Sequence, residues 1–244
     1  MPAAAIIFHK VHLAFAGQVL FQDLSFTLDQ GGCTCLLGPS GCGKSTILQL
    51  ITGRSSLSYS GEISCQDAAD IKAQAAWMAQ DDLLLPWLDV ESNVLLGAKL
   101  RGQVTGALQK KAGRLLEEAG LGGYEHALPA TLSGGMRQRV ALLRTLMEDR
   151  SILLMDEPFS ALDSLTRMKL QNLAARLTHG ATVVLVTHDP MEALRMSSRI
   201  LVLGGDPVQV TSDIRLQGTP PRDAGDPEIL QRYPDLLDLL MGGT

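Results

Sequence analysis

One glycine-rich run constrains the fold of this chain more than any other segment. It matches the pattern G-x-x-x-x-G-K-[ST] with an extra glycine inside, and its residues are Gly38, Pro39, Ser40, Gly41, Cys42, Gly43, Lys44, Ser45 and Thr46. An apolar run precedes it, and apolar residues at helical spacing follow it. Glycines let the backbone curl so that N–H groups point at phosphate oxygens, and the following helix adds its dipole. We therefore predict a strand, a phosphate-binding loop and a helix, with Lys44 on the β and γ phosphates and Ser45 on Mg²⁺.

Short apolar runs elsewhere define the predicted sheets. Three of them are almost wholly apolar, as expected for strands of a parallel sheet covered by helices: Cys33 to Leu37, Ile152 to Met155 and Thr182 to Val186. The first thirty residues mix apolar and polar positions around Gly17, which predicts a small antiparallel sheet from Ile6 to Leu28. The chain is thus expected to be an α/β protein with a mainly parallel sheet.

The middle of the chain has a different character. Between Asp81 and Arg150 no convincing strand pattern occurs, and apolar residues recur at helical spacing at Leu108, Ala112, Leu115, Leu116 and Ala119. This segment is predicted to be an inserted helical subdomain. After Gly204 the chain reads as loop-rich, before a short apolar helix around Ile229 to Met241.

Composition excludes several classes of function. The chain has 244 residues, of which 45% are hydrophobic and 19% charged, as in folded globular proteins. Its net charge of −5 offers no basic stripe, so no nucleic-acid partner is expected. Its apolar stretches fall far short of the roughly 20 residues that cross a bilayer, and no secretion signal is recognisable. We expect a cytoplasmic protein with reduced thiols, among which Cys42 lies where positive potential would lower its pKa.

A second group of candidate residues follows two of the predicted strands. Asp156 and Glu157 end the run that begins at Ile152, and His188 follows the run that begins at Thr182. Ligands of open α/β sheets lie at the carboxyl ends of the strands. Asp156 is expected to hold Mg²⁺, and Glu157 to polarise the attacking water. His188 is expected to contact the γ phosphate, whereas the other histidines are treated as structural or surface residues.

The run from Leu132 to Arg139, with Ser133, Gly134 and Gly135 before a predicted helix, resembles the signature of ABC ATPases. The resemblance extends from about Val11 to Leu203. It implies a P-loop NTPase core and one ABC ATPase domain over residues 1–244, with residues 1–80 and 151–244 as core and 81–150 as helical signature subdomain. In this family the signature binds the γ phosphate held by a second subunit. Two ATP molecules are then enclosed in a dimer of this chain, or of this chain with a closely related ATPase.

Three more positions resemble functional residues of the family. Gln80 resembles the glutamine that touches Mg²⁺ and the attacking water, and Asp163 the aspartate that contacts the partner subunit. Phe15 occupies the place of the aromatic residue that stacks on adenine, where tyrosine is more usual. Phenylalanine retains the π face, so stacking is expected to survive.

The segment that follows Gln80, from Asp81 to Val94, is similar to that of importers for nitrate, sulfonate, taurine and thiamine pyrimidine precursors. The resemblance implies transmembrane permease subunits, a periplasmic solute-binding protein and a peripheral location on the cytoplasmic face of the inner membrane. Leu83 to Leu85 and Trp87 suit a groove for a helix of the permease. They suit the core of the helical subdomain equally well.

Other classes remain as alternatives. A soluble ABC ATPase of translation or DNA repair usually carries two cassettes or a long coiled-coil insertion, and an exporter is commonly fused to membrane segments. A nucleotide kinase with the same phosphate loop would leave Ser133 to Gly135 and His188 without a role. The sequence does not identify the transported solute.

Overall fold

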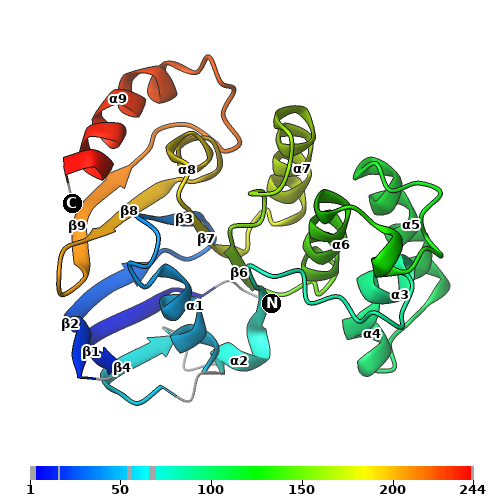
Figure 1. Ribbon diagram of the computed structural model, residues 1–244, viewed down its shortest axis with the longest axis horizontal. Coiled ribbons are helices and arrows are strands. Elements are labelled where there is room, and N and C mark those ends of the chain that lie inside the picture. Colours follow the sequence, from blue (N-terminus) through cyan, green and yellow to red (C-terminus); the bar gives the residue numbers. More distant parts are fainter. Residues whose placement is uncertain (1–3, 16, 54–56, 66–69, 243–244) are drawn as a thin grey trace.

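The computed structural model describes residues 4–15, 17–53, 57–65 and 70–242. Two sheets and a helical segment make up this part of the chain (Figure 1). The six-stranded sheet has the order β5-β6-β7-β3-β8-β9, in which the first five strands run parallel and β9 is antiparallel. Its strands are Ala75–Met78 (β5), Ile152–Asp156 (β6), Thr182–Thr187 (β7), Cys33–Leu37 (β3), Arg199–Gly204 (β8) and Gln209–Arg215 (β9). The predicted α/β fold class with a mainly parallel sheet is confirmed.

The antiparallel sheet has the order β2-β1-β4, with strands Ile6–Phe15 (β1), Gln18–Leu28 (β2) and Tyr59–Cys65 (β4). The sequence shows β1 and β2 each as two apolar runs. The structure joins these runs across irregularities of register, and Lys10 and Asp23 have positive φ angles of 47° and 53°. Such bulges interrupt the alternation of a strand without ending it. β4 was not predicted, because Tyr59–Cys65 is largely exposed and contains Gly61.

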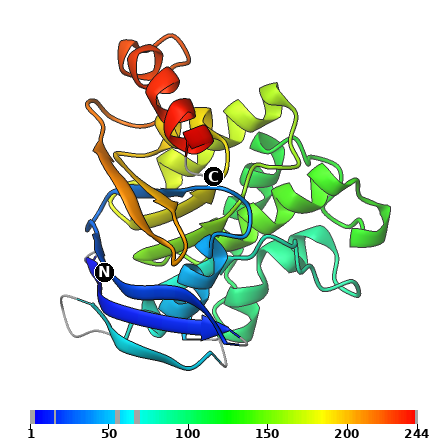
Figure 2. The same ribbon diagram turned by 60° about the vertical axis from the view of Figure 1, so that its left-hand side comes forward.

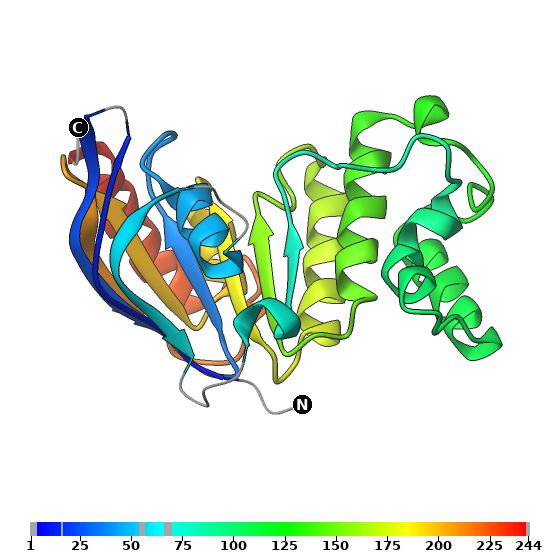
Figure 3. The ribbon, with the colours of Figure 1, turned by 90° about the horizontal axis from the view of Figure 1, so that it is seen from below.

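The core consists of layers on the faces of the parallel sheet. Helix α1 (Lys44–Thr52) lies between the two sheets, so that Ile47 and Leu48 pack with Phe8 of β1 and Leu154 of β6 (Figure 3). Helices α8 (Pro190–Met196) and α9 (Pro227–Gly242) pack on Cys35 and the neighbouring strand β8, and α9 lies far from the antiparallel sheet (Figure 2).

The segment from Asp81 to Arg150 contains helices and no strand, as its periodicity predicts. Its helices are α3 (Val90–Val94), α4 (Leu96–Leu100), α5 (Gly106–Glu118), the 3-10 turn η1 (Pro129–Thr131) and α6 (Gly134–Leu146). Helix α6 packs against α3, α5, β5 and the later helix α7 (Ser164–Leu177). One apolar cluster therefore continues from this segment to the sheet. A short helix α2 (Ile71–Gln74) precedes β5.

One expectation about the end of the chain is wrong. The residues after Gly204, read as loop-rich, include strand β9, whose side chains alternate between exposed and half-buried. Pairing with β8 and ion pairs of Asp213 with Arg199 hold this edge strand. The final helix is confirmed as α9. None of the helices in the described ranges combines the length and apolar character needed to cross a bilayer.

Candidate active site

The phosphate loop has the backbone that its glycines predict. Gly43 caps α1 in the left-handed region, with φ of 85°. A Cβ atom at Gly43 would lie 2.8 Å from the ring of Phe21, and one at Gly38 would lie 2.6 Å from the carbonyl oxygen of Leu203. Contacts that short are not tolerated, so both positions require glycine. Pro39, Ser40 and Gly41 are exposed, as a loop that receives a ligand has to be.

Lys44 lies inside this loop and is 6% exposed. Its ammonium donates hydrogen bonds to the carbonyl oxygens of Gly38 at 2.8 Å and Pro39 at 2.7 Å. Buried charge requires such partners. The ammonium is therefore held within the loop, and Ser45 and Thr46 follow it in the first turn of α1.

The expectation for Cys42 is wrong. Burial raises the pKa of its thiol, and the nearby charge of Lys44 only partly offsets that effect. The side chain is 9% exposed, so desolvation of the thiolate outweighs the positive potential of the loop. Cys42 is free, like the other three cysteines, and is not an activated thiol.

Asp156 lies at the end of β6 beside the first turn of α1. Its carboxylate accepts a hydrogen bond from the Ser45 hydroxyl. Burial raises the pKa of Asp156, the bond from Ser45 lowers it, and Glu157 raises it further. Within the described residues, Asp156 Oδ1 is buried and has no hydrogen-bond partner. A buried carboxylate oxygen with free lone pairs, next to a hydroxyl, suits a cation.

A hydroxyl and a carboxylate are compatible with Mg²⁺. Over the described part of the chain, no group of three or more His, Cys, Asp or Glu side chains could hold a metal ion. Mg²⁺ does not need one, because it usually binds through one or two carboxylates together with waters and phosphate oxygens. Ser45 and Asp156 would be able to supply such a small set of oxygen ligands.

Glu157 follows Asp156 with a positive φ of 48°, which is uncommon for a residue other than glycine. Its N–H donates to the carbonyl oxygen of Val186 on β7 at 2.9 Å. Its Oε1 lies 3.0 Å from Nδ1 of His188, the residue that follows β7. The Glu157 side chain is 17% exposed and that of His188 56%. Both residues were predicted to lie at this edge of the sheet, and there the two side chains meet, with the imidazole facing outward.

Gln138, a residue without a predicted role, holds the backbone of Glu157 by a hydrogen bond. Gln138 of α6 is 6% exposed and donates to the carbonyl oxygen of Glu157 at 2.9 Å and to Ser160 Oγ at 3.2 Å. Its own Oε1 accepts from the N–H of Ala161 at 2.8 Å. It thus fastens α6 to the loop after β6. Sequence spacing gives no signal for this contact, because it joins residues about twenty positions apart in two different elements.

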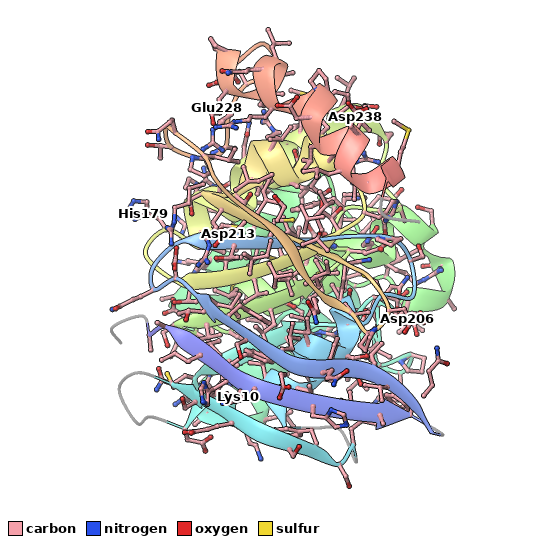
Figure 4. The ribbon with its side chains drawn as sticks, turned by 90° about the vertical axis from the view of Figure 1, so that its left-hand side faces the viewer. Lys10, His179, Asp206, Asp213, Glu228 and Asp238 are labelled. Carbon is pink, nitrogen blue, oxygen red and sulfur yellow. The ribbon has the colours of Figure 1, made fainter. Side chains whose placement is uncertain are left out.

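Phe15 is brought to the phosphate loop at the end of β1. It lines a pocket of about 350 Å³ with Ser40, Gly41, Cys42 and Asp206, among others. Figure 4 places Asp206 at the turn between β8 and β9. The Phe15 ring is 47% exposed, so its face is open to a planar ligand beside the loop.

Within the described residues, no hydrogen bond or ion pair joins the other predicted residues to this edge. Ser133 caps α6 and accepts from the N–H of Met136, with Gly134 and Gly135 in the first turn after it. Asp163 caps α7 and accepts from the N–H of Thr166. Gln80 is exposed and lies two residues beyond β5.

The chain is similar in sequence to known proteins. The family model described as ABC transporter matches residues 21–160. An aliphatic sulfonates import ATP-binding protein of Pseudomonas savastanoi pv. phaseolicola is 42% identical, over 93% of this chain and 92% of that protein. A similarly named protein of Pseudomonas syringae pv. tomato is 44% identical over 88% of each chain.

A solved structure shares the fold. The ATP-binding cassette MJ0796, described as a dimer in a post-hydrolysis state bound to ADP and Pi, has a TM-score of 0.76 to this chain. It is 30% identical and covers 87% of this chain and 99% of its own. The family model covers more than half of the chain and the relatives cover most of it, so the chain belongs to the ABC transporter family.

Proposed function

We propose that this chain is the ATP-binding and ATP-hydrolysing subunit of an importer that carries a small solute through a separate membrane permease. The observation that carries the proposal is the convergence at one sheet edge. There Asp156 Oδ1 has no partner in the described residues, Ser45 lies beside it, and Glu157 pairs with His188. These groups lie next to a phosphate loop that contains a lysine. Together they are the functional groups that hydrolysis of a nucleoside triphosphate requires.

Each residue has a defined task. The loop N–H groups and Lys44 bind the phosphates, and Phe15 stacks on adenine. Ser45 and Asp156 hold Mg²⁺, with Gln80 as a further contact, and the metal ion neutralises charge that develops on the phosphate oxygens. Glu157 orients the attacking water and accepts its proton, and the contact with His188 Nδ1 fixes the carboxylate.

The strained backbone at Glu157 supports this role. A positive φ costs about 1–3 kcal/mol and persists only where the surroundings impose it. Here the bonds from Glu157 N–H to Val186 and from Gln138 to the Glu157 carbonyl fix both sides of the residue. The carboxylate is therefore aimed before substrate arrives, which is how an enzyme avoids reorganisation during the reaction.

The site is completed by a second copy of the chain or a closely related ATPase. Ser133 and the N–H groups of Gly134 and Gly135 form a capped helix start that is exposed and suits an anion. In the dimer it would face the γ phosphate held by the partner, with Asp163 at the interface. ATP binding then closes the dimer, and hydrolysis releases it.

The helical segment 81–150 is the part we assign to the permease. Leu84 is buried in the core, but Leu83 is 59% exposed and Trp87 is 71% exposed. Leu84 thus fits the interpretation that this apolar run packs in the core. The exposed pair, Leu83 and Trp87, fits the other interpretation, that the run accepts a helix of the permease. In this proposal the chain lies peripherally on the cytoplasmic face of the membrane, and a periplasmic binding protein delivers the solute on the other side. An aliphatic sulfonate is the cargo to test first, because the named relatives import that class.

The test uses Glu157→Gln in the isolated chain and in the complex with its permease. The amide retains the shape of Glu157 but cannot accept a proton, so ATP hydrolysis should fall about 10²- to 10⁴-fold. ATP should still drive dimer formation, measured by analytical ultracentrifugation. Glu117→Gln, an exposed carboxylate on α5, is the matched control and should hydrolyse ATP normally. Undiminished hydrolysis by Glu157→Gln would overturn the role of this residue.

A further inference from the structure

Two arginines of α6 grip the turn that follows Gln80. Arg137 Nε pairs with Asp82 Oδ2 at 2.9 Å. Arg144 donates to the carbonyl oxygen of Asp82 at 2.7 Å and to that of Leu83 at 2.8 Å. The two arginines are seven residues apart, which places them on one face of the helix.

The gripped turn is strained and presents its apolar side chain outward. Leu83 has a positive φ of 45°, a genuine outlier for a bulky residue. The N–H of Leu84 donates to Asp82 Oδ1 at 3.2 Å, which closes the turn locally. A conformation of this kind persists only if its surroundings impose it, and here the guanidinium groups do so. Leu83 is thereby held exposed at the surface assigned to the permease.

Arg137 also makes a hydrogen bond at the start of α6. Arg137 Nη1 also donates to the carbonyl oxygen of Leu132 at 2.8 Å, and Leu132 immediately precedes the cap residue Ser133. Arg137 therefore connects Asp82 of the turn to the backbone that sets the position of Ser133. A lone ion pair at this exposure, 37% for Arg137 and 31% for Asp82, contributes little. It is part of a network, however, because Arg137 also donates to the carbonyl oxygen of Leu132, and Arg144 donates to those of Asp82 and Leu83.

The electrostatics of Arg144 favour the same interpretation. Burial lowers the pKa of its guanidinium, while the charges of Asp82 and Glu148 oppose that effect. Partial burial of a charged guanidinium costs desolvation free energy, and its two hydrogen bonds to backbone carbonyl oxygens offset that cost. Arg144 consequently fixes the turn, and Arg137 links the fixed turn to the helix start.

We propose that Asp82, Arg137 and Arg144 form a clamp through which displacement of the turn at Leu83 moves Ser133. The three are positioning residues, since none touches substrate in this arrangement. The inference rests on the proposed function, in which the turn meets the permease and Ser133 meets the nucleotide of a partner. The clamp then couples movement of the permease to completion of the ATP site.

The first test needs neither nucleotide nor permease. Asp82→Asn retains the oxygen that accepts from Leu84 but removes the charge that pairs with Arg137. Hydrogen exchange of the nucleotide-free chain should become about 3- to 10-fold faster both in the turn at residues 83–84 and in the first turn of α6. Faster exchange in the turn alone would overturn the proposal.

A matched control separates the clamp from general loosening of the helical segment. Arg101 and Glu148 form an ion pair of similar exposure in the same segment, and Arg101→Ala removes it. This variant should leave exchange of both turns unchanged. If it accelerates both, the clamp has no special role and the proposal fails. Arg137→Lys, which retains the charge but not the forked donors, should reproduce the effect of Asp82→Asn in part.

The second test measures dimer formation in the Glu157→Gln background. Asp82→Asn should weaken the ATP-driven dimer about 3- to 10-fold while ATP binding to the single chain is unchanged. An unweakened dimer would contradict the link to Ser133. If no variant, including the background chain, dimerises with ATP, the proposed function fails, whereas the exchange experiment still decides on the clamp.

Discussion

The sheet edge and the helical segment hold their functional groups in opposite ways. At the edge, Lys44 and Asp156 are 6% and 3% exposed, and strands buried on both faces bring them together within one chain. In the helical segment, Ser133 is exposed, and its recorded hydrogen bond is to its own helix. In the proposed function, the edge supplies one half of an active site, and the helix start supplies the other half to a second chain.

Ser133→Glu should have the largest effect of the variants that divide these two regions. A carboxylate at the helix start repels the γ phosphate of the partner, so ATP hydrolysis should fall about 10²- to 10³-fold. ATP binding to the single chain, measured by calorimetry, should be unchanged because the phosphate loop is intact. Weaker binding by the monomer would show that the two regions are not separate halves.

Asp156→Asn tests the sheet edge. An amide is a poorer ligand for Mg²⁺ than a carboxylate, so the Mg²⁺ concentration for half-maximal hydrolysis should rise about 10- to 100-fold. Chelation of the metal ion should abolish hydrolysis in the parent protein. An unchanged Mg²⁺ dependence in the variant would remove Asp156 from the metal site.

Glu192 is a buried carboxyl group of α8, close behind His188 in the sequence, and it tests how burial affects the stability of this edge. It is 4% exposed, and burial raises its pKa to about 7, although a hydrogen bond from Thr187 opposes the shift. The charges of Asp189, Arg167 and His188 add smaller effects. Because the fold favours the protonated form, its contribution to the free energy of unfolding is present below the usual pKa and is lost as pH rises through about 7.

Glu192→Gln should therefore flatten the pH dependence. The parent protein should lose about 1.4 kcal/mol between pH 6 and pH 8.5 relative to the variant, as measured by denaturant unfolding. Glu117→Gln, exposed on α5, serves as the control and should follow the parent protein. Parallel curves for the parent protein and Glu192→Gln would contradict a protonated Glu192.

The smallest effect is expected at Phe15. Loss of the ring in Phe15→Ala should weaken ATP binding about 5- to 10-fold, whereas Phe15→Tyr should bind as tightly as the parent protein. Fluorescence titration with a labelled nucleotide measures both. Equal binding by all three proteins would place adenine elsewhere than the pocket beside Ser40 and Gly41.

Much of the sheet edge can be predicted because its patterns are local. The glycines and their spacing to Lys44 indicate a tightly curled phosphate loop, and acids at the end of an apolar run indicate the carboxyl end of a buried strand. The location of Glu157 and His188 at one edge follows from the rule that ligands lie at the carboxyl ends of the strands, whereas their direct contact was not predicted. The comparisons confirm the predicted family, and the roles of the individual residues stay predictions.

The contacts of α6 could not be predicted, because they join distant segments through side chains. Gln138 reaches the loop after β6, and Arg137 reaches Asp82, fifty-five residues away. Neither contact is indicated by a periodicity of the sequence or by a characteristic spacing of residues. The pKa of Cys42 was misjudged for a related reason, since the sequence reveals the charge of Lys44 but not the depth of burial that outweighs it.

One mixing experiment tests most directly whether the two halves come from different chains. Lys44→Ala removes the loop lysine, Ser133→Glu blocks the helix start, and each variant alone should be inactive. A mixed dimer contains one site with both defects and one site with neither. Random pairing should therefore restore roughly a quarter of the parent activity. A mixture as inactive as its two components would show that the halves do not meet across a dimer.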